Sequence, residues 1–163
     1  MAGFGEITNE TVNIVEAFPP VDTTGVGQTG NMISMKNASH ITIIIQAGAW
    51  AGGATGITIE QATDVTDSET SSKAVSFSWM WTNIAAVGAS ALVKTAVIAN
   101  TFDIGTAASM HIIEIDVDML DVDNGYDCLQ VLTDTPGANA DLISAVYILS
   151  GTRHSGDNAS LSN

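Results

Sequence analysis

The segment 111–118 constrains the fold most, because its apolar and acidic side chains alternate. Three aliphatic residues fall on one side and three acidic residues on the other, the two-residue period of a half-buried β-strand: Ile113, Ile115 and Val117 against Glu114, Asp116 and Asp118. Two more strands are predicted at 126–132 and 142–149, joined by a turn at 134–139. The strand at 142–149 is apolar on both faces except at Ser144, so we expect it to be central or covered on both sides.

The preceding part of the chain carries the same kind of signal. Six more strands, bounded by turn-forming residues, are predicted at 32–35, 40–46, 57–61, 74–82, 92–98 and 101–104. We expect 40–46 and 57–61 to pair as a hairpin about the loop 47–56, which consists mostly of Ala and Gly. In the segment 74–82, four large apolar side chains share one side and are expected to line the core: Val75, Phe77, Trp79 and Trp81.

These strands, with no convincing 3.6-residue periodicity, predict an all-β fold. A chain of 163 residues is expected to form one domain with a sizeable core. We therefore predict a single-domain antiparallel β-sandwich or barrel over residues 31–153, jelly-roll-like, with about eight strands. In the two least patterned segments, 83–90 and 118–121, the sequence leaves a helix as an alternative. Residues 154–163 are predicted to be a polar C-terminal tail.

Residues 1–30 differ in composition and predict an extended N-terminal arm. The pair Pro19-Pro20 forbids a helix there, and apolar residues cluster just before it. Such an arm could lay its hydrophobic anchors on its own domain or on a neighbouring protein. The alternative is that the segment is the first edge strand of the domain followed by a loop. As partner-contact candidates in this arm we name Ile14, Val15, Phe18 and Pro19.

The charge balance restricts the possible partners. Eighteen acidic residues stand against four basic ones, a formal net charge of −14, so we expect no direct binding to nucleic acid. No run approaches the ~20 apolar residues of a membrane span, and no secretory signal is visible at the N-terminus. We therefore expect no membrane association. We also expect the protein to be made in the cytoplasm. The one cysteine, Cys128, is expected to be a small buried hydrophobe.

The densest constellation of candidate ligands is acidic. Asp121, Asp123 and Asp127 surround Asn124 and Gly125, and calcium takes 6–8 oxygen ligands of this kind. The spacing nevertheless departs from the EF-hand pattern, because the glycine comes one position early and no glutamate closes the loop. Asp and Asn are also ordinary turn residues. We favour a solvated turn over a metal site and expect no cofactor.

Other chemistry-bearing residues form no catalytic set. His40, His111 and His154 have none of the zinc-site spacings, and we expect them to be strand-end or exposed residues. There is no nucleophile elbow and no glycine-rich phosphate loop, so we expect no enzyme. Trp50 stands in a loop of small residues. It is either a contact anchor for a partner or a cap on its own domain.

Two parts of the chain resemble a family of small virion structural proteins of tailed bacteriophages. The first is the Ser-Met-Lys-Asn turn in 31–37, followed by the Ile-rich strand and Ala-Gly loop at 40–49. The second comprises Asn124-Gly125-Tyr126 within 123–129 and the segment 145–153, which ends in Gly-Thr-Arg. The resemblance covers about residues 31–153 and is anchored at these two ends; the middle, including Trp79 and Trp81, does not match.

The resemblance implies a non-enzymatic component of the phage particle. The expected role is a head decoration or cement protein that binds the major capsid protein and stabilises the shell. Proteins of this kind commonly form trimers at lattice symmetry positions, so a homotrimer in the virion is expected by analogy. Two alternatives are a tail, collar or head–tail connector component and, in a different class, a calcium- or glycan-binding β-sandwich module.

Overall fold

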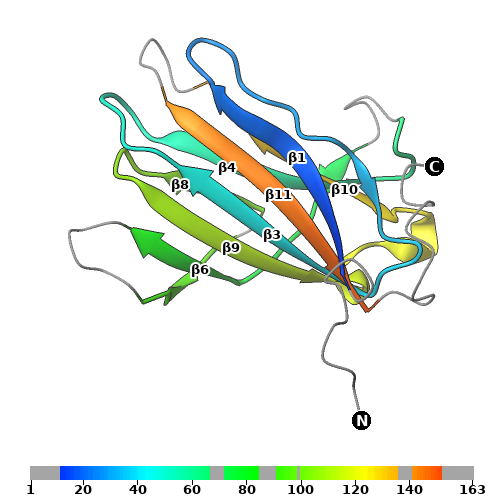
Figure 1. The fold of residues 1–163 in the computed structure, drawn as a ribbon. Coiled ribbons are helices and arrows are strands. Elements are labelled where there is room, and N and C mark those ends of the chain that lie inside the picture. Colours follow the sequence, from blue (N-terminus) through cyan, green and yellow to red (C-terminus); the bar gives the residue numbers. More distant parts are fainter. Residues whose placement is uncertain (1–11, 67–71, 85–90, 99, 136–140, 152–163) are drawn as a thin grey trace, which may run out of the picture.

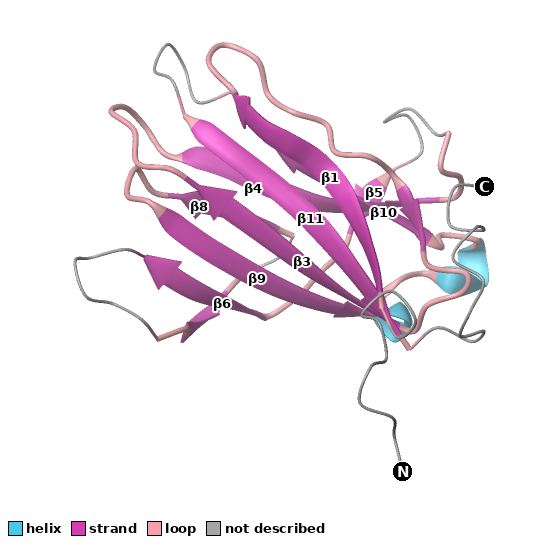
Figure 2. Ribbon diagram, in the orientation of Figure 1, coloured by secondary structure: helices cyan, strands magenta, loops and turns pink. Residues whose placement is uncertain are grey.

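The chain folds into two antiparallel β-sheets packed face to face, seen in a computed structural model (Figures 1 and 2). The structure describes residues 12–66, 72–84, 91–98, 100–135 and 141–151. The all-β sandwich expected from the alternating sequence is confirmed, with eleven strands in place of about eight. The additional strands arise because the predicted segment 74–82 is divided into two strands and because residues 13–22 of the predicted arm form a strand.

Six strands form the first sheet. Their order is β1 (Asn13–Asp22), β11 (Leu142–Ser150), β3 (His40–Ala47), β9 (Ser109–Asp116), β6 (Trp79–Ile84) and β7 (Val93–Ala96). The second sheet has the order β2 (Ile33–Ser34), β10 (Cys128–Thr133), β4 (Thr55–Ala62) and β5 (Lys73–Ala74), and β8 (Thr101–Ile104) also pairs with β4. Two 3₁₀ turns, η1 (Val117–Met119) and η2 (Val122–Asn124), connect β9 to β10.

The order of strands is that of a jelly roll. Within each sheet, strands from the two ends of the chain alternate, as in β1-β11-β3-β9 and β2-β10-β4. The β6–β7 hairpin then extends the first sheet beyond β9. The topology thus confirms the jelly-roll-like expectation.

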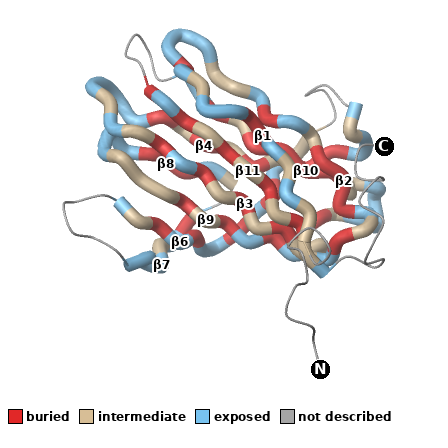
Figure 3. Tube along the Cα trace, in the orientation of Figure 1, coloured by how far each residue is buried: buried red, intermediate tan, exposed pale blue. Residues whose placement is uncertain are grey.

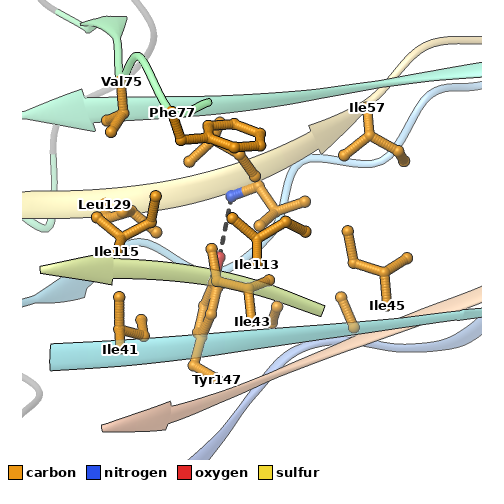
Figure 4. Close-up of a cluster of buried hydrophobic side chains, with 14 of the residues drawn as sticks. Ile41, Ile43, Ile45, Ile57, Val75, Phe77, Ile113, Ile115, Leu129 and Tyr147 are labelled. Atoms are coloured by element: carbon orange, nitrogen blue, oxygen red, sulfur yellow. Dashed lines mark hydrogen bonds between the residues drawn. The ribbon is translucent and has the colours of Figure 1, made fainter. Parts of the chain in front are cut away.

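The predicted hairpin of 40–46 with 57–61 is wrong. β3 pairs with β11 and β9, whereas β4 pairs with β10, β5 and β8. The intervening segment 48–54 crosses from one sheet to the other, over the ~10 Å that separates packed sheets. As a result Ile43 and Ile45 face Ile57 across the core (Figure 4). Period-2 patterning fixes which side of a strand is buried but not which strand lies beside it.

The segment 74–82 is not one continuous strand, and its predicted core face is wrong in its second half. Val75 and Phe77 are buried, but Trp79 is 52% exposed and Trp81 38% exposed. Met80 and Thr82 are buried instead. The phase changes because the chain leaves the second sheet after β5 and enters the first sheet at β6.

The described part of the predicted arm belongs to the sandwich. β1 is the edge strand of the first sheet and pairs with β11, with register irregularities on either side of Phe18. Pro19 and Pro20 fall at this irregular part, where an edge strand tolerates the missing N–H donors. Gly30 then donates to the Val131 carbonyl at 2.8 Å. The edge-strand alternative therefore describes residues 13–22, while residues 1–11 and the predicted tail 154–163 lie outside the described residues.

Candidate interaction surface

The outer face of the six-stranded sheet carries a continuous row of side chains. The residues of this row are register partners from one edge strand to the other: Glu16, Val146, Ile44, Ile112, Trp81 and Lys94. A second row runs beside it through Ile14, Ile148, Thr42 and Glu114. We call these two rows, with Trp79, the outer face.

Most of this face is apolar although the described residues leave it uncovered. Ile14 is 57% exposed, while Ile44, Ile112, Val146 and Ile148 are only partly buried. Figure 3 shows the cause: along β3, β9 and β11, buried positions alternate with partly buried or exposed ones, so only one side of the sheet meets the core. The expectation that the strand at 142–149 is central is confirmed, but its outer side has no cover in the described structure.

Trp79, Trp81 and Lys94 form the most prominent cluster on this face. The Lys94 ammonium lies 4.5 Å from the Trp79 ring centroid and 6.0 Å from that of Trp81, within the range of a cation–π interaction. The three residues line a shallow hollow of about 380 Å³ with Phe77, Ser78, Glu114 and Met119. The Lys94 ammonium contacts the two indole rings, whereas those of Lys36 and Lys73 form ion pairs with Asp127 and Asp121.

The chemistry of the cluster suits contact with another protein. Exposed tryptophans are among the residue types that dominate binding energy at protein interfaces. The flanking Ile and Val side chains supply apolar area, and Glu16 and Glu114 border it with charge. A contiguous apolar surface rimmed by polar groups is typical of an interaction site.

The predicted partner-contact residues are only partly brought together. Ile14 belongs to the outer face, and Pro19 is exposed on the same edge strand. Val15 packs against the core and Phe18 is 4% exposed within it, so both stabilise this domain itself. Trp50 is partly buried against the core, and its indole N–H donates to the Gly53 carbonyl at 2.9 Å. Of the two interpretations of Trp50, the structure favours the cap on its own domain.

The predicted acidic loop is held by lysines. Asp121 pairs with Lys73 and accepts 2.9 Å hydrogen bonds from the Asn124 amide. Lys73, followed by Asn124, holds the pKa of Asp121 below its usual value. Asp127 lies 3.6 Å from the Lys36 ammonium, while Asp123 is exposed in η2. Within the described ranges, no three His, Cys, Asp or Glu residues gather as metal ligands.

The histidines and the cysteine differ in environment. His40 begins β3 and its Nδ1 lies 2.8 Å from Asp116 Oδ1, a strand-end position as expected. His111 is 3% exposed inside β9, so the expectation of an exposed or strand-end position is wrong for it. His154 lies outside the described residues. Burial, followed by the neighbouring Asp127, raises the pKa of the Cys128 thiol to about 12, which suits a buried hydrophobe.

The sequence does not indicate the tryptophan–lysine cluster, because the alternation over 74–82 continues across a change of sheet. One signal did point to the outer face: the strand at 142–149 has apolar residues on both sides. In the part of the chain that the structure describes, no helix has the length and apolarity of a transmembrane span.

Comparison with known proteins does not assign this chain to a family. No protein-family model matches the chain, and no curated protein matches it. Among solved structures, it is similar to a chain described as "Structure of infectious bursal disease virus Gt strain", with a TM-score of 0.26 and 9% identity. The match covers 92% of this chain and 42% of that chain, so this protein spans less than half the length of the viral one. Similarity at this level leaves the function to be argued from the surface itself.

Proposed function

We propose that this protein is a non-enzymatic structural component of a tailed-phage particle, a head decoration protein that binds the major capsid protein through its outer face. One observation carries the proposal. β11 is apolar on both sides and central in its sheet, yet Val146 and Ile148 meet no covering layer in the described structure. A protein partner would complete the burial that the sequence of this strand indicates.

The sequence resemblance supports the choice of partner. Its first part covers the turn before β3 and β3 itself, and its second part covers η2, the start of β10 and most of β11. β3 and β11 are neighbours in the first sheet and supply Ile44, Val146 and Ile148 to the outer face. Jelly rolls occur in viral capsid domains and in lectins, so the fold alone does not choose between these functions.

Charge complementarity restricts the chemistry of the partner surface that can bind the outer face. The Lys94 ammonium lies over two exposed indole rings. A carboxylate on the partner, placed opposite this ammonium, would form an ion pair with it inside an otherwise apolar contact. The rest of this chain is strongly acidic, with a net charge of −14. We therefore expect the partner surface to be apolar at its centre and neutral or basic at its rim. Assembly as a trimer on the phage head is part of the same proposal, by analogy with cement proteins.

Binding to phage heads that lack this protein tests the proposal. We expect Trp81→Ala to weaken binding about thirtyfold, as for a hot-spot residue. Ile14→Ala should weaken it less, whereas Ile98→Ala, a matched change at a 92% exposed position outside the outer face, should leave it unchanged. Equal binding by wild type and Trp81→Ala would contradict the proposed surface, and absence of any binding would contradict the partner.

Two alternatives are separated by direct measurements. Copy number in purified particles distinguishes the shell, with hundreds of copies, from a tail, collar or connector, with a dozen or fewer. The glycan-binding alternative is favoured by the two exposed tryptophans of β6, but Lys94 lies over their rings and would compete with a stacked sugar. A glycan array with wild type and Trp79→Ala would establish this alternative if binding were seen and lost in the variant.

A further inference from the structure

The two edges of the six-stranded sheet differ in how open they are to a further strand. β1, at one edge, carries Pro19 and Pro20 and register irregularities, which hinder pairing with another chain. β7, at the other edge, is regular and contains no proline. Figure 3 shows β7 at the margin of the sheet beside β6, and among the described residues no strand pairs with its far side. β7 is therefore an open strand edge.

The backbone groups of two β7 residues point away from the sheet. The Val97 N–H donates to the Ser78 carbonyl at 2.9 Å, and these two residues continue the β6–β7 register. The hydrogen bonds of an antiparallel strand alternate between its two sides. Residues 93, 95 and 97 therefore bond toward β6, whereas Lys94 and Ala96 present their N–H and C=O groups at the open edge. Another extended strand is the ligand that pairs with such a row of groups.

The side chain of Lys94 does not close this edge. A charged side chain, especially lysine, commonly protects an edge strand from pairing. Here the ammonium lies 4.5 Å from the centroid of the Trp79 ring, and Trp79 belongs to β6, on the side of β7 opposite to the open edge. The lysine side chain thus lies back over its own sheet and leaves the edge accessible.

Exposed apolar side chains concentrate around the same edge. Ten large hydrophobic residues are exposed in the described part of the chain, and six of them lie in β6, in β7 or next to β7: Trp79, Trp81, Ile84, Leu92, Val93 and Ile98. β6 and β7 contain no acidic residue, although the chain has a net charge of −14. This edge therefore combines free backbone groups with apolar area and lacks the acidic charge that would repel a second copy at close range.

We propose that two copies of this chain associate through their β7 strands, in an antiparallel pairing with a twofold axis at Thr95. This register places Lys94 opposite Ala96 of the second copy, so their edge-facing groups bond to each other. It also places Leu92 opposite Ile98 of the second copy, one exposed apolar residue against another. An axis at Lys94 would instead set two lysines directly opposite each other, which is destabilising.

The contact is independent of the proposed function, because it joins copies of this chain and does not involve the capsid protein. An isologous contact uses the same patch on both copies. β1 and the second sheet take no part in it, so they stay available for the proposed trimer. Because the twofold axis is perpendicular to the sheet, both tryptophan–lysine clusters lie on one face of the joined sheet.

Disulfide trapping tests the register of the contact. Thr95 would face Thr95 of the second copy as a non-hydrogen-bonded pair, in which the Cα atoms lie about 4.5 Å apart, a distance that a disulfide can span. We expect Thr95→Cys to form a covalent dimer under mild oxidation. Val93→Cys is the matched control and should form little dimer, because residue 93 lies opposite residue 97. The native Cys128 is buried and does not compete.

Sedimentation of the full chain tests the association without a cross-link. We expect a reversible monomer–dimer equilibrium that strengthens with salt, because salt screens the repulsion between two acidic copies. Ala96→Pro removes an N–H at the open edge, where a strand tolerates proline. It should weaken dimerisation at least about tenfold while the circular dichroism spectrum stays unchanged. Ala96→Ser keeps the N–H and should dimerise like the wild type.

Three results would each overturn the proposal. They are a chain that stays monomeric up to about 1 mM, a dimer that Ala96→Pro leaves undiminished, and equal cross-linking of the two cysteine variants. A monomeric chain would leave the β7 edge to a strand of another protein. Ile98→Ala should weaken the dimer and leave binding to phage heads unchanged, so a failure of this contact is distinguishable from a failure of the proposed function.

Discussion

The phenol oxygen of Tyr147 accepts a hydrogen bond of 3.0 Å from the backbone N–H of Val131. Tyr147 lies in β11 of the six-stranded sheet and Val131 in β10 of the five-stranded sheet, so this bond joins the two layers through the core (Figure 4). Tyr147 is fully buried, and burial raises the pKa of its phenol above the ordinary value. The hydroxyl therefore keeps its proton at neutral pH.

Tyr147→Phe removes the acceptor while keeping the ring in the core. The Val131 N–H would then be buried without a partner, because β2 is only two residues long and pairs with Cys128 and Leu129 of β10. We expect the free energy of unfolding to fall by about 1–3 kcal/mol. Urea unfolding followed by far-UV circular dichroism measures the change.

Tyr126→Phe is the matched control for this prediction. Tyr126 is partly exposed, and its ring lies under the Lys73 ammonium at 3.9 Å, a contact that phenylalanine retains. Its stability change should stay within about 0.5 kcal/mol. Similar losses of stability in both variants would show that the hydrogen bond between the sheets contributes no more to the free energy of unfolding than the partly exposed hydroxyl of Tyr126 does.

Asp141 is a buried carboxylate that joins three segments. One oxygen accepts from the backbone N–H of Thr23 at 3.2 Å and from its hydroxyl, and the other accepts from the Thr55 hydroxyl at 2.8 Å. All three residues are almost fully buried. Asp141→Ala removes the acceptor of the two threonine hydroxyls, while the Thr23 N–H keeps its 3.1 Å bond to the backbone carbonyl of residue 141, and it should cost at least about 2 kcal/mol.

Calorimetric melting of two further variants checks the role of Asp141. Asp141→Asn retains an acceptor oxygen and should cost less than Asp141→Ala. Asp123→Ala, an exposed aspartate in η2, should change stability by no more than about 0.5 kcal/mol. An Asp141→Ala protein as stable as Asp123→Ala would be inconsistent with this structural role.

Local patterns predicted most strands, because side-chain alternation depends only on neighbours in sequence. The predicted segments 40–46, 101–104 and 142–149 lie within β3, β8 and β11 with ends shifted by no more than one residue. Strand pairing was not predictable in this way. In a jelly roll, β3 lies beside β11 and β9, and no local signal in 40–46 indicates those partners. The one short-range pairing that we inferred, between 40–46 and 57–61, was accordingly wrong.

The sequence pattern does not reveal the candidate surface, because the chain changes sheet within the segment 74–82. Val75, Phe77, Trp79 and Trp81 keep one period in sequence, but the chain passes between sheets after Phe77. The first two residues therefore point into the core and the tryptophans point out of it. Thr82 is buried and lies opposite His111 in the neighbouring strand, although the alternation over 74–82 places it on the side opposite to the predicted core face. Buried polar residues cannot be told from surface ones by pattern alone.

His111 makes stability depend on pH. Its pKa is about 4 in the folded chain, against 6.5 as the ordinary value. The unfolded chain therefore binds more protons between these values, and stability should fall as pH drops from 6.5 to 4. A difference of this size corresponds to about 3 kcal/mol.

Comparing variants isolates the histidine from the many carboxylates that also titrate. His111→Phe should lose less stability than wild type between pH 7 and pH 4.5. His40→Gln, at the partly exposed start of β3, is the comparison variant that removes a histidine outside the core. Parallel pH profiles for wild type and His111→Phe would contradict a neutral, buried imidazole.

The outward orientation of the two β6 tryptophans can be tested by fluorescence. Trp50→Phe leaves Trp79 and Trp81 as the emitters, whereas the double variant Trp79→Phe/Trp81→Phe leaves Trp50, since the chain has three tryptophans. Trp79 and Trp81 are exposed, while Trp50 is partly buried with its N–H bonded to Gly53. We expect redder emission and stronger acrylamide quenching from Trp50→Phe than from the double variant. Blue, poorly quenched emission from Trp50→Phe would instead place both β6 tryptophans in the core, and the outer face would lose its principal anchors. Added phage heads should protect these two rings from acrylamide if the outer face is the contact surface, so the same variant connects the orientation of β6 to the proposed binding.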